Sequence, residues 1–190
     1  MTLINKLTVL QNNVSSCTKC ELHKNKTNYV FSRGNPSSKI MIVGEGPGHD
    51  EDIAGKPFVG LSGKLLDKAL VEAGLNPETD VYVCNIVKCR PPGNRKPTQD
   101  ESDSCIDYLE EQINIIDPQV ILTLGNTATE NLINTTFGVT KIHGKSFKRR
   151  NSKVIPAYHP SFILRNGGSN SQQYQEFLAD IKTAISLVTG

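Results

Sequence analysis

The sequence lacks a long hydrophobic run, an export signal and an excess of charge of either sign. No stretch of its 190 residues approaches the roughly 18 consecutive apolar residues of a membrane span, which argues against a membrane protein. The first residues, MTLINKLTVLQNNV, have neither a long apolar core nor a small-residue cleavage site, so we expect a soluble, cytoplasmic protein. A net charge of +2 neither requires nor excludes a nucleic-acid partner.

Hydrophobic residues make up 37% of the chain, which is enough for one buried core and too little for two. We therefore expect residues 1–190 to form a single domain, and we expect a monomer. The chain has five cysteines and no sign of export. Because the cytosol keeps thiols reduced, these cysteines are predicted to be metal ligands or buried thiols rather than disulfides.

Four short apolar segments, each followed by turn or helix-start residues, are predicted to be buried strands. They are residues 39–43, 81–87, 120–124 and 153–158. Helical periodicity lies between them, and the chain begins and ends with amphipathic segments. The predicted helices are residues 3–14, 62–73, 98–116, 127–133 and 174–188. This alternation predicts an α/β fold, a three-layer α/β/α sandwich with a central four-stranded parallel sheet.

Three polar motifs follow predicted strands. The glycine-rich residues 44–48 follow the first strand, Asn85 ends the second, and His159 begins an HPS motif after the fourth. Ligands of open parallel sheets bind beyond the carboxyl ends of the strands, so the three motifs are expected to meet in one crevice. The loop lacks the third glycine of a dinucleotide-binding fingerprint, because His49 stands at that position.

Each of these motifs also has a purely structural interpretation. The glycines could form an ordinary turn, the amide of Asn85 could satisfy a nearby turn, and a histidine at the end of a strand is often structural. As functional groups, an amide can donate to and accept from the polar edge of a base. An imidazole could stabilise a departing anion.

Four of the cysteines have the pattern of a metal site. Cys17 and Cys20 form a C-x-x-C pair, and Cys89 and Cys105 flank the segment PPGNRKPT. A second C-x-x-C pair, common in zinc sites, is absent, so the pattern suits a [4Fe-4S] cluster at least as well as zinc, and spacing alone does not choose the metal. Cys84 lies in the middle of a predicted strand and is interpreted as a small apolar core residue.

Taken together, these motifs resemble the iron-sulfur (family 4) uracil-DNA glycosylases of the uracil-DNA glycosylase superfamily. The resemblance runs from about Cys17 to Arg165 and includes GEGPGHDED, GKPFVG, NIVKCRPPGNRKPT and HPSFILR. It implies that four cysteines bind a [4Fe-4S] cluster and that Cys84 does not. It also implies a uracil pocket in which Phe58 stacks on the flipped base, Asn85 reads its polar edge and His159 contacts O2. The implied cluster ligands are Cys17, Cys20, Cys89 and Cys105, and the pocket is lined further by Gly44, Glu45 and Gly46.

The chain departs from the cluster-free members of that superfamily, which have an aspartate and a tyrosine where this chain has Gly46 and Gly48. Within the resembling family, the carboxylate that matches Glu51 is expected to orient the attacking water, although an acidic helix start or solvated loop is the alternative. The resemblance further predicts that the HPSFILR segment enters the minor groove, where Ile163 or Leu164 fills the gap left by the base. The predicted DNA-contacting residues are Ser161, Ile163, Leu164 and Arg165.

The expected reaction is hydrolysis of the N-glycosidic bond of uracil in single- or double-stranded DNA, which leaves an abasic site for base excision repair. Catalysis is assigned to His159, Asn85 and Glu51. No motif places a lysine as a Schiff-base nucleophile, so the enzyme is expected to be monofunctional. Two rival functions are an iron-sulfur electron-transfer protein and a non-catalytic DNA-binding module.

Overall fold

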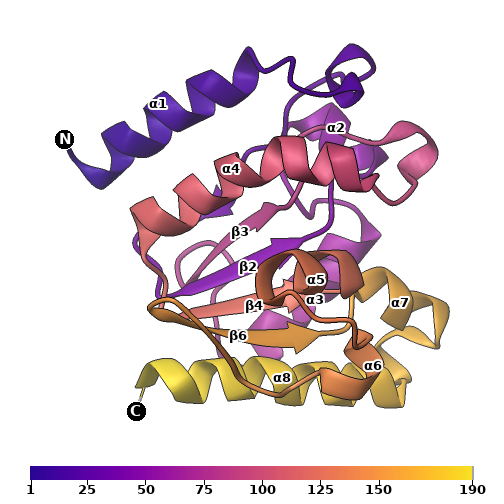
Figure 1. Ribbon diagram of the computed structural model, residues 1–190. Helices are drawn as coiled ribbons and strands as arrows, with labels where there is room; N and C mark the ends of the chain where they lie inside the picture. The colour runs from indigo at the N-terminus through magenta and orange to yellow at the C-terminus, as the bar shows by residue number, and fades with distance from the viewer. Residues whose placement is uncertain (190) are drawn as a thin grey trace.

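A six-stranded sheet forms the centre of the computed structural model, which describes residues 1–189 (Figure 1). The strand order is β1-β3-β2-β4-β6-β5. The four predicted strands are its inner members, and they run parallel to one another. Their bounds are β2 (Ile40–Gly44), β3 (Val81–Asn85), β4 (Val120–Leu124) and β6 (Ser152–Ala157).

The prediction of a four-stranded, purely parallel sheet was wrong, because an antiparallel strand is added at each edge. These strands are β1 (Arg33–Gly34), which pairs with β3, and β5 (Phe147–Arg149), which pairs with β6. Both are too short and too polar to show the apolar pattern of a buried strand. The sheet is therefore mixed, and its two edges are closed by short strands, as is common for exposed sheet edges.

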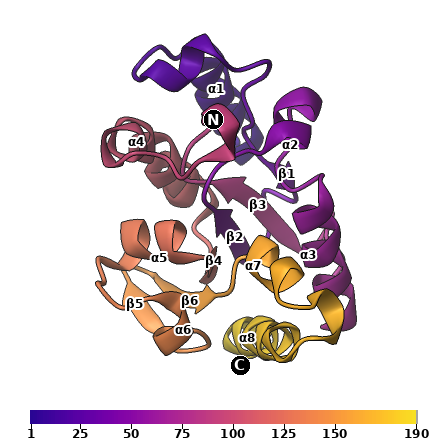
Figure 2. The ribbon, with the colours of Figure 1, turned by 90° about the vertical axis from the view of Figure 1, so that its right-hand side faces the viewer.

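Helices cover both faces of this sheet (Figure 2). On one face, α3 (Leu61–Glu72) and α8 (Gln172–Thr189) pack their apolar stripes against alternate residues of the inner strands. On the other face lie α1 (Leu3–Ser15), α4 (Gln99–Ile116) and α5 (Asn126–Ile133). The α/β class and the predicted layers are confirmed. In residues 1–189 no helix is long and apolar enough to cross a membrane.

The start of α4 is fixed by a capping box. The Thr98 hydroxyl accepts the backbone N–H of Glu101 at 3.2 Å, and the Glu101 carboxylate accepts the backbone N–H of Thr98 at 2.8 Å. This exchange satisfies two amide groups that the first turn of a helix leaves free. It fixes where the segment carrying Arg95 joins the helix, since the Arg95 guanidinium also pairs with Glu101.

Three short helices lie where the sequence showed only loops. They are α2 (His49–Ala54), α6 (Val139–Ile142) and α7 (Pro160–Arg165). None spans more than six residues, so helical periodicity has no room to appear. Two of them matter for function, because α2 follows the loop after β2 and α7 follows His159 after β6. Three further segments form short 3-10 helices: Glu21–Lys24, Pro92–Asn94 and Gly168–Asn170.

Candidate functional site

A hollow of about 350 Å³ lies at the carboxyl edge of the sheet, where the three polar motifs meet. Its walls come from the loop after β2, the end of β3, the loop before α3 and the start of α7. Gly44 and Asn85 are register partners on β2 and β3, which brings the first two motifs together at the end of the sheet. The hollow is lined by Glu45, Gly46, Pro47, Gly48, Glu51, Phe58, Ser62, Asn85, Pro91, Asn94, Arg95, His159, Ser161 and Arg165.

Asn85 is the least satisfied polar group of this hollow. The residue is 2% exposed, and its buried Oδ1 has no hydrogen-bond partner among the described residues. Its backbone is fixed, because the ammonium of Lys88 donates to the Asn85 carbonyl at 2.7 Å. Leaving a buried polar atom unpaired costs free energy, so such an atom needs an explanation. In this position Oδ1 can accept a hydrogen bond from a ligand with a complementary polar edge.

Gly44 lets Asn85 and Phe58 lie close against the end of β2. A Cβ atom at Gly44 would lie 2.5 Å from Oδ1 of Asn85 and 2.5 Å from Cζ of Phe58. Both distances are shorter than any van der Waals contact, so a side chain at this position would displace the amide or the ring. Both groups also line the hollow, which therefore has a polar amide and an aromatic ring in its wall.

His159 lies near Phe58, with the ring centroids 6.1 Å apart and the ring planes inclined by 36°. Its Nδ1 accepts the backbone N–H of Ser161 at 3.2 Å and lies 2.8 Å from the Ser161 hydroxyl oxygen. An Nδ1 that accepts this bond leaves the proton of a neutral imidazole on Nε2. Burial, together with the charge of Arg165, lowers the pKa of His159 from 6.5 to about 4. The ring is therefore neutral at physiological pH and offers one N–H as a donor.

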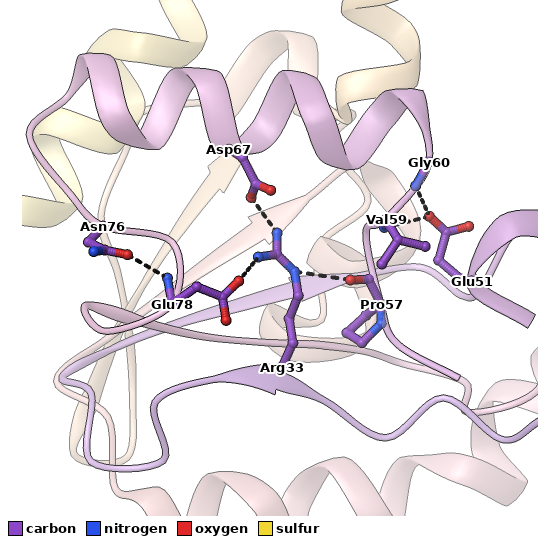
Figure 3. A network of polar contacts seen from close by, with 8 residues as sticks. All are labelled: Arg33, Glu51, Pro57, Val59, Gly60, Asp67, Asn76 and Glu78. Atoms are coloured by element: carbon purple, nitrogen blue, oxygen red, sulfur yellow. Dashed lines mark hydrogen bonds and ion pairs between the residues drawn. The ribbon is translucent and has the colours of Figure 1, made fainter. Parts of the chain in front are cut away.

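Glu51 lines the hollow, but its carboxylate is already bound to the backbone. Oε1 accepts the N–H groups of Val59 at 3.0 Å and Gly60 at 2.9 Å (Figure 3). Oε2 accepts the N–H group of Gly48 at 3.1 Å. A carboxylate has about four acceptor positions, so three are used by the protein itself. The interpretation of this segment as an acidic helix start is confirmed, because Glu51 is the third residue of α2 and caps it. Glu45, at the opposite wall, accepts the hydroxyl of Thr127.

The HPSFILR segment divides between pocket and core. Ser161 and Arg165 line the hollow, and Leu164 is 38% exposed. Ile163 is fully buried in the core between α3, α7 and the sheet. This burial removes Ile163 from the predicted DNA-contacting residues, because a core side chain cannot enter a groove without local unfolding. Leu164 is the apolar side chain of α7 that faces outward.

The four predicted cysteine ligands line a single, separate hollow beside α1 and α4. Cys17 and Cys20 come from the segment after α1, Cys89 from the loop after β3, and Cys105 from α4. Cys84 does not line this hollow and is fully buried in the core.

Burial raises the pKa of Cys20 and Cys105, and raises that of Cys89 to about 12. The neighbouring thiols add to the shift of each of these groups, so the four sulfurs are close enough to repel one another when ionised. In residues 1–189 no three His, Cys, Asp or Glu side chains converge as the ligands of a single metal ion would. Buried thiols that become thiolates need a positive partner, and an iron-sulfur group bound through four separated thiolates fits this donor set.

Sequence reasoning missed two buried cations near the site. Lys88 is 1% exposed and donates to the Asn85 carbonyl and, at 2.5 Å, to Oε1 of Gln112. Arg33 lies under the loop that carries Phe58. The position of Lys88, between Asn85 and Cys89 in the NIVKC motif, was the only available signal, while Arg33 has no motif around it.

Comparison with known proteins points in the same direction. Residues 31–182 match the family model described as the uracil DNA glycosylase superfamily. A protein of Thermotoga maritima named type-4 uracil-DNA glycosylase is 44% identical over 182 residues, which cover 95% of this chain and 93% of that protein. Proteins of the same name are 44% identical over 177 residues in Archaeoglobus fulgidus and 42% identical over 172 residues in Sulfurisphaera tokodaii. Those two matches cover 89% and 86% of this chain, and 86% and 78% of the respective relatives.

Proposed function

Because the chain belongs to the uracil-DNA glycosylase superfamily, we propose that it is a DNA repair enzyme that removes uracil from DNA. The reaction is hydrolysis of the N-glycosidic bond, which leaves an abasic site. The observation that carries this assignment is the buried Oδ1 of Asn85, unpaired among residues 1–189, in a hollow that the Phe58 ring also lines. The hollow provides both an aromatic face and a polar edge for a flat base.

Uracil matches these groups when it is turned out of the DNA stack. Its N3–H donates and its O4 accepts, and a carboxamide can do the reverse of both. Phe58 supplies the stacking face, while Gly44, Glu45 and Gly46 form the remaining wall. Flipping the nucleotide costs a few kcal/mol, least for a mispaired base such as uracil opposite guanine.

His159 acts on the leaving group. As the glycosidic bond breaks, negative charge grows on the uracil ring, and the neutral imidazole donates its Nε2–H to O2. A fixed donor of this kind typically lowers the activation barrier by about 3 kcal/mol, which raises the rate a hundredfold or more. The bond from Ser161 to Nδ1 holds the ring in the tautomer that this role needs.

Glu51 keeps one acceptor position beyond its three backbone bonds, and we assign to it the positioning of the attacking water. The developing sugar cation makes an uncharged water a sufficient nucleophile. Among the described residues, no lysine lines the uracil pocket. We therefore propose a monofunctional glycosylase without lyase activity.

The DNA contacts are assigned to α7, which follows His159. Leu164 enters the space left by the flipped base, and Ser161 and Arg165 at the mouth of the pocket contact the adjoining phosphates. The substrate is uracil-containing DNA, either single- or double-stranded.

We propose that Cys17, Cys20, Cys89 and Cys105 hold a [4Fe-4S] cluster. When bound, the cluster supplies a structural cross-link between the segment after α1 and the loop that follows Asn85. Along the sequence, the ligands Cys89 and Cys105 lie before and after Arg95, which lines the uracil pocket. The cluster-binding segment and the glycosylase are parts of one domain, residues 1–190, which we propose acts as a cytoplasmic monomer.

The assignment is tested with iron-loaded protein and a 5′-labelled duplex that contains one uracil opposite guanine, followed by alkaline strand scission. Wild-type protein is expected to give one cut at the uracil position, and Asn85→Ala and His159→Ala are each expected to be at least a hundredfold slower. A thymine duplex of the same sequence is the substrate control. Intact strands with the wild-type protein would refute the proposed function, and they are what an electron-transfer protein or a non-catalytic DNA-binding module predicts.

A further inference from the structure

Phe58 has a backbone conformation that a phenylalanine adopts only under constraint. Its φ angle is +55°, in the left-handed region, and the residue is 7% exposed. Such a conformation is unfavourable for a bulky L-residue and persists only where the surrounding structure enforces it. The direction of the stacking ring therefore depends on whatever holds the peptide groups on either side of Phe58.

Two charged side chains hold those groups from opposite sides (Figure 3). Before Phe58, the carbonyl of Pro57 accepts a hydrogen bond from Nε of Arg33 at 3.0 Å. After Phe58, the two following N–H groups donate to Glu51, as described above. Gly63 of α3 packs directly against the Phe58 carbonyl group, since a Cβ atom at Gly63 would lie 1.8 Å from that carbonyl oxygen.

Arg33 is itself held by two other elements. It lies on the edge strand β1, and its side chain is 8% exposed. One terminal nitrogen pairs with Asp67 of α3, and the other lies 3.5 Å from a carboxylate oxygen of Glu78. A guanidinium can meet three acceptors in different directions because its donors form a rigid planar fork, which the single ammonium of lysine cannot reproduce. The carbonyl of Pro57 is thus tied to both β1 and α3 through one side chain.

We propose that Arg33 is a positioning residue for the uracil-stacking ring: it fixes Pro57, and with it the left-handed backbone of Phe58, without lining the pocket. Arg33 is not among the residues that surround the uracil hollow, so it acts only through the loop. The inference rests on the proposed function, since it assigns to Phe58 the stacking of the flipped base.

The first variant is Arg33→Met, which keeps the length of the buried stem and removes every donor. We expect kcat/KM for uracil release to fall by between about fivefold and a hundredfold, the range that base–aromatic stacking spans. Inhibition by free uracil should weaken by a similar factor, because the free base uses the stacking face without any DNA contact. Arg33→Lys should recover only part of either loss.

The matched control is Lys68→Met, which removes an ion pair with Glu72 on the same helix as Asp67. Lys68 bonds to Glu72 and does not line the pocket, so this variant should keep both wild-type values. A double variant makes the test specific: in a Phe58→Ala background, Arg33→Met should cause no further loss, because the ring that it positions is gone.

Full additivity of the Arg33 and Phe58 substitutions would overturn the proposal, as would unchanged uracil inhibition in Arg33→Met. If Arg33→Met does not fold, as judged by its iron content and thermal unfolding, the same two measurements on Arg33→Lys decide the question. A wild-type protein that releases no uracil would instead refute the proposed function, which separates the two failures.

Discussion

Replacing Asn85 by leucine should make the protein more stable and nearly inactive at the same time. Leucine has the same number and branching of side-chain heavy atoms as asparagine and no polar atoms, although its methyl groups are larger than the amide oxygen and nitrogen. In the structure the Asn85 side chain is buried, and its Oδ1 has no partner among the described residues. The substitution therefore removes an unpaired acceptor, and the Asn85 side chain makes no hydrogen bond within residues 1–189 that would be lost.

The size of both effects follows from the cost of unpaired polar groups. An unsatisfied buried acceptor costs about 1–3 kcal/mol, and removing it should raise the free energy of unfolding by up to that amount. For a chain of this size, each kcal/mol shifts Tm by roughly 2–4 °C. In the complex, leucine would leave N3–H and O4 of uracil unpaired, at about 1–3 kcal/mol each, so kcat/KM should fall on the order of 10²- to 10⁴-fold.

The measurements are thermal unfolding of the iron-loaded proteins and single-turnover uracil release. Thr123→Val is a matched control on β4, the strand on the other side of β2, because the Thr123 hydroxyl is also buried but is hydrogen-bonded to that of Thr129 at 2.8 Å. That control should lose stability and keep its activity. An Asn85→Leu protein that is less stable than wild type, or that still releases uracil at the wild-type rate, would refute the argument from the unpaired oxygen.

Three further predictions concern the histidine, the thiols and the glycine wall. The pKa of His159 is about 4 in the folded protein and 6.5 in the unfolded chain, so the unfolded chain binds more protons between those values. The free energy of unfolding of the wild type, relative to that of His159→Gln, should therefore fall by roughly 2 kcal/mol between pH 7.5 and pH 5. Chemical denaturation measures this difference, and a difference that does not change with pH would contradict the prediction. Cys89→Ser should lose iron and sulfide, measured by colorimetric analysis, whereas Cys84→Ser should retain both, since Cys84 lies outside the thiol-lined hollow. Gly44→Ala should abolish uracil release, with little change in far-UV circular dichroism, because its methyl group would displace Asn85 or Phe58; a fully active variant would contradict the roles proposed for these two side chains.

The inner part of the fold could be predicted from the sequence because its signals are local. The four parallel strands are short apolar runs, and helix α4 begins at a capping box. The edge strands β1 and β5 carry no such signal, since two or three half-exposed residues pair only because a strand already lies beside them. Their existence is a consequence of the tertiary structure.

The candidate site divides in the same way. Asn85 and His159 could be placed at one sheet edge, because parallel strands bring their carboxyl ends together. The burial of Ile163 could not be predicted, because the sequence 160–165 gave no sign of the helix α7 that turns this side chain into the core. Arg33 could not be found either, since it acts on Pro57 across 24 residues of sequence and stands in no motif.

Through its carboxylate, Glu51 holds the loop that carries Phe58, in addition to the role in positioning water that we propose for it. Its carboxylate was expected to act on water, yet most of its acceptor positions hold the backbone N–H groups that follow Phe58 and precede α2. Water positioning and ring positioning thus depend on the same two oxygen atoms. Removing the carboxylate frees one side of a strained residue whose other side is held by Arg33, so the stacking ring moves whatever happens to the water. A loss of activity in a Glu51 variant is therefore explained first by displacement of the Phe58 ring. Only a variant that keeps the hydrogen bonds to Val59 and Gly60 isolates the role of Glu51 in positioning water.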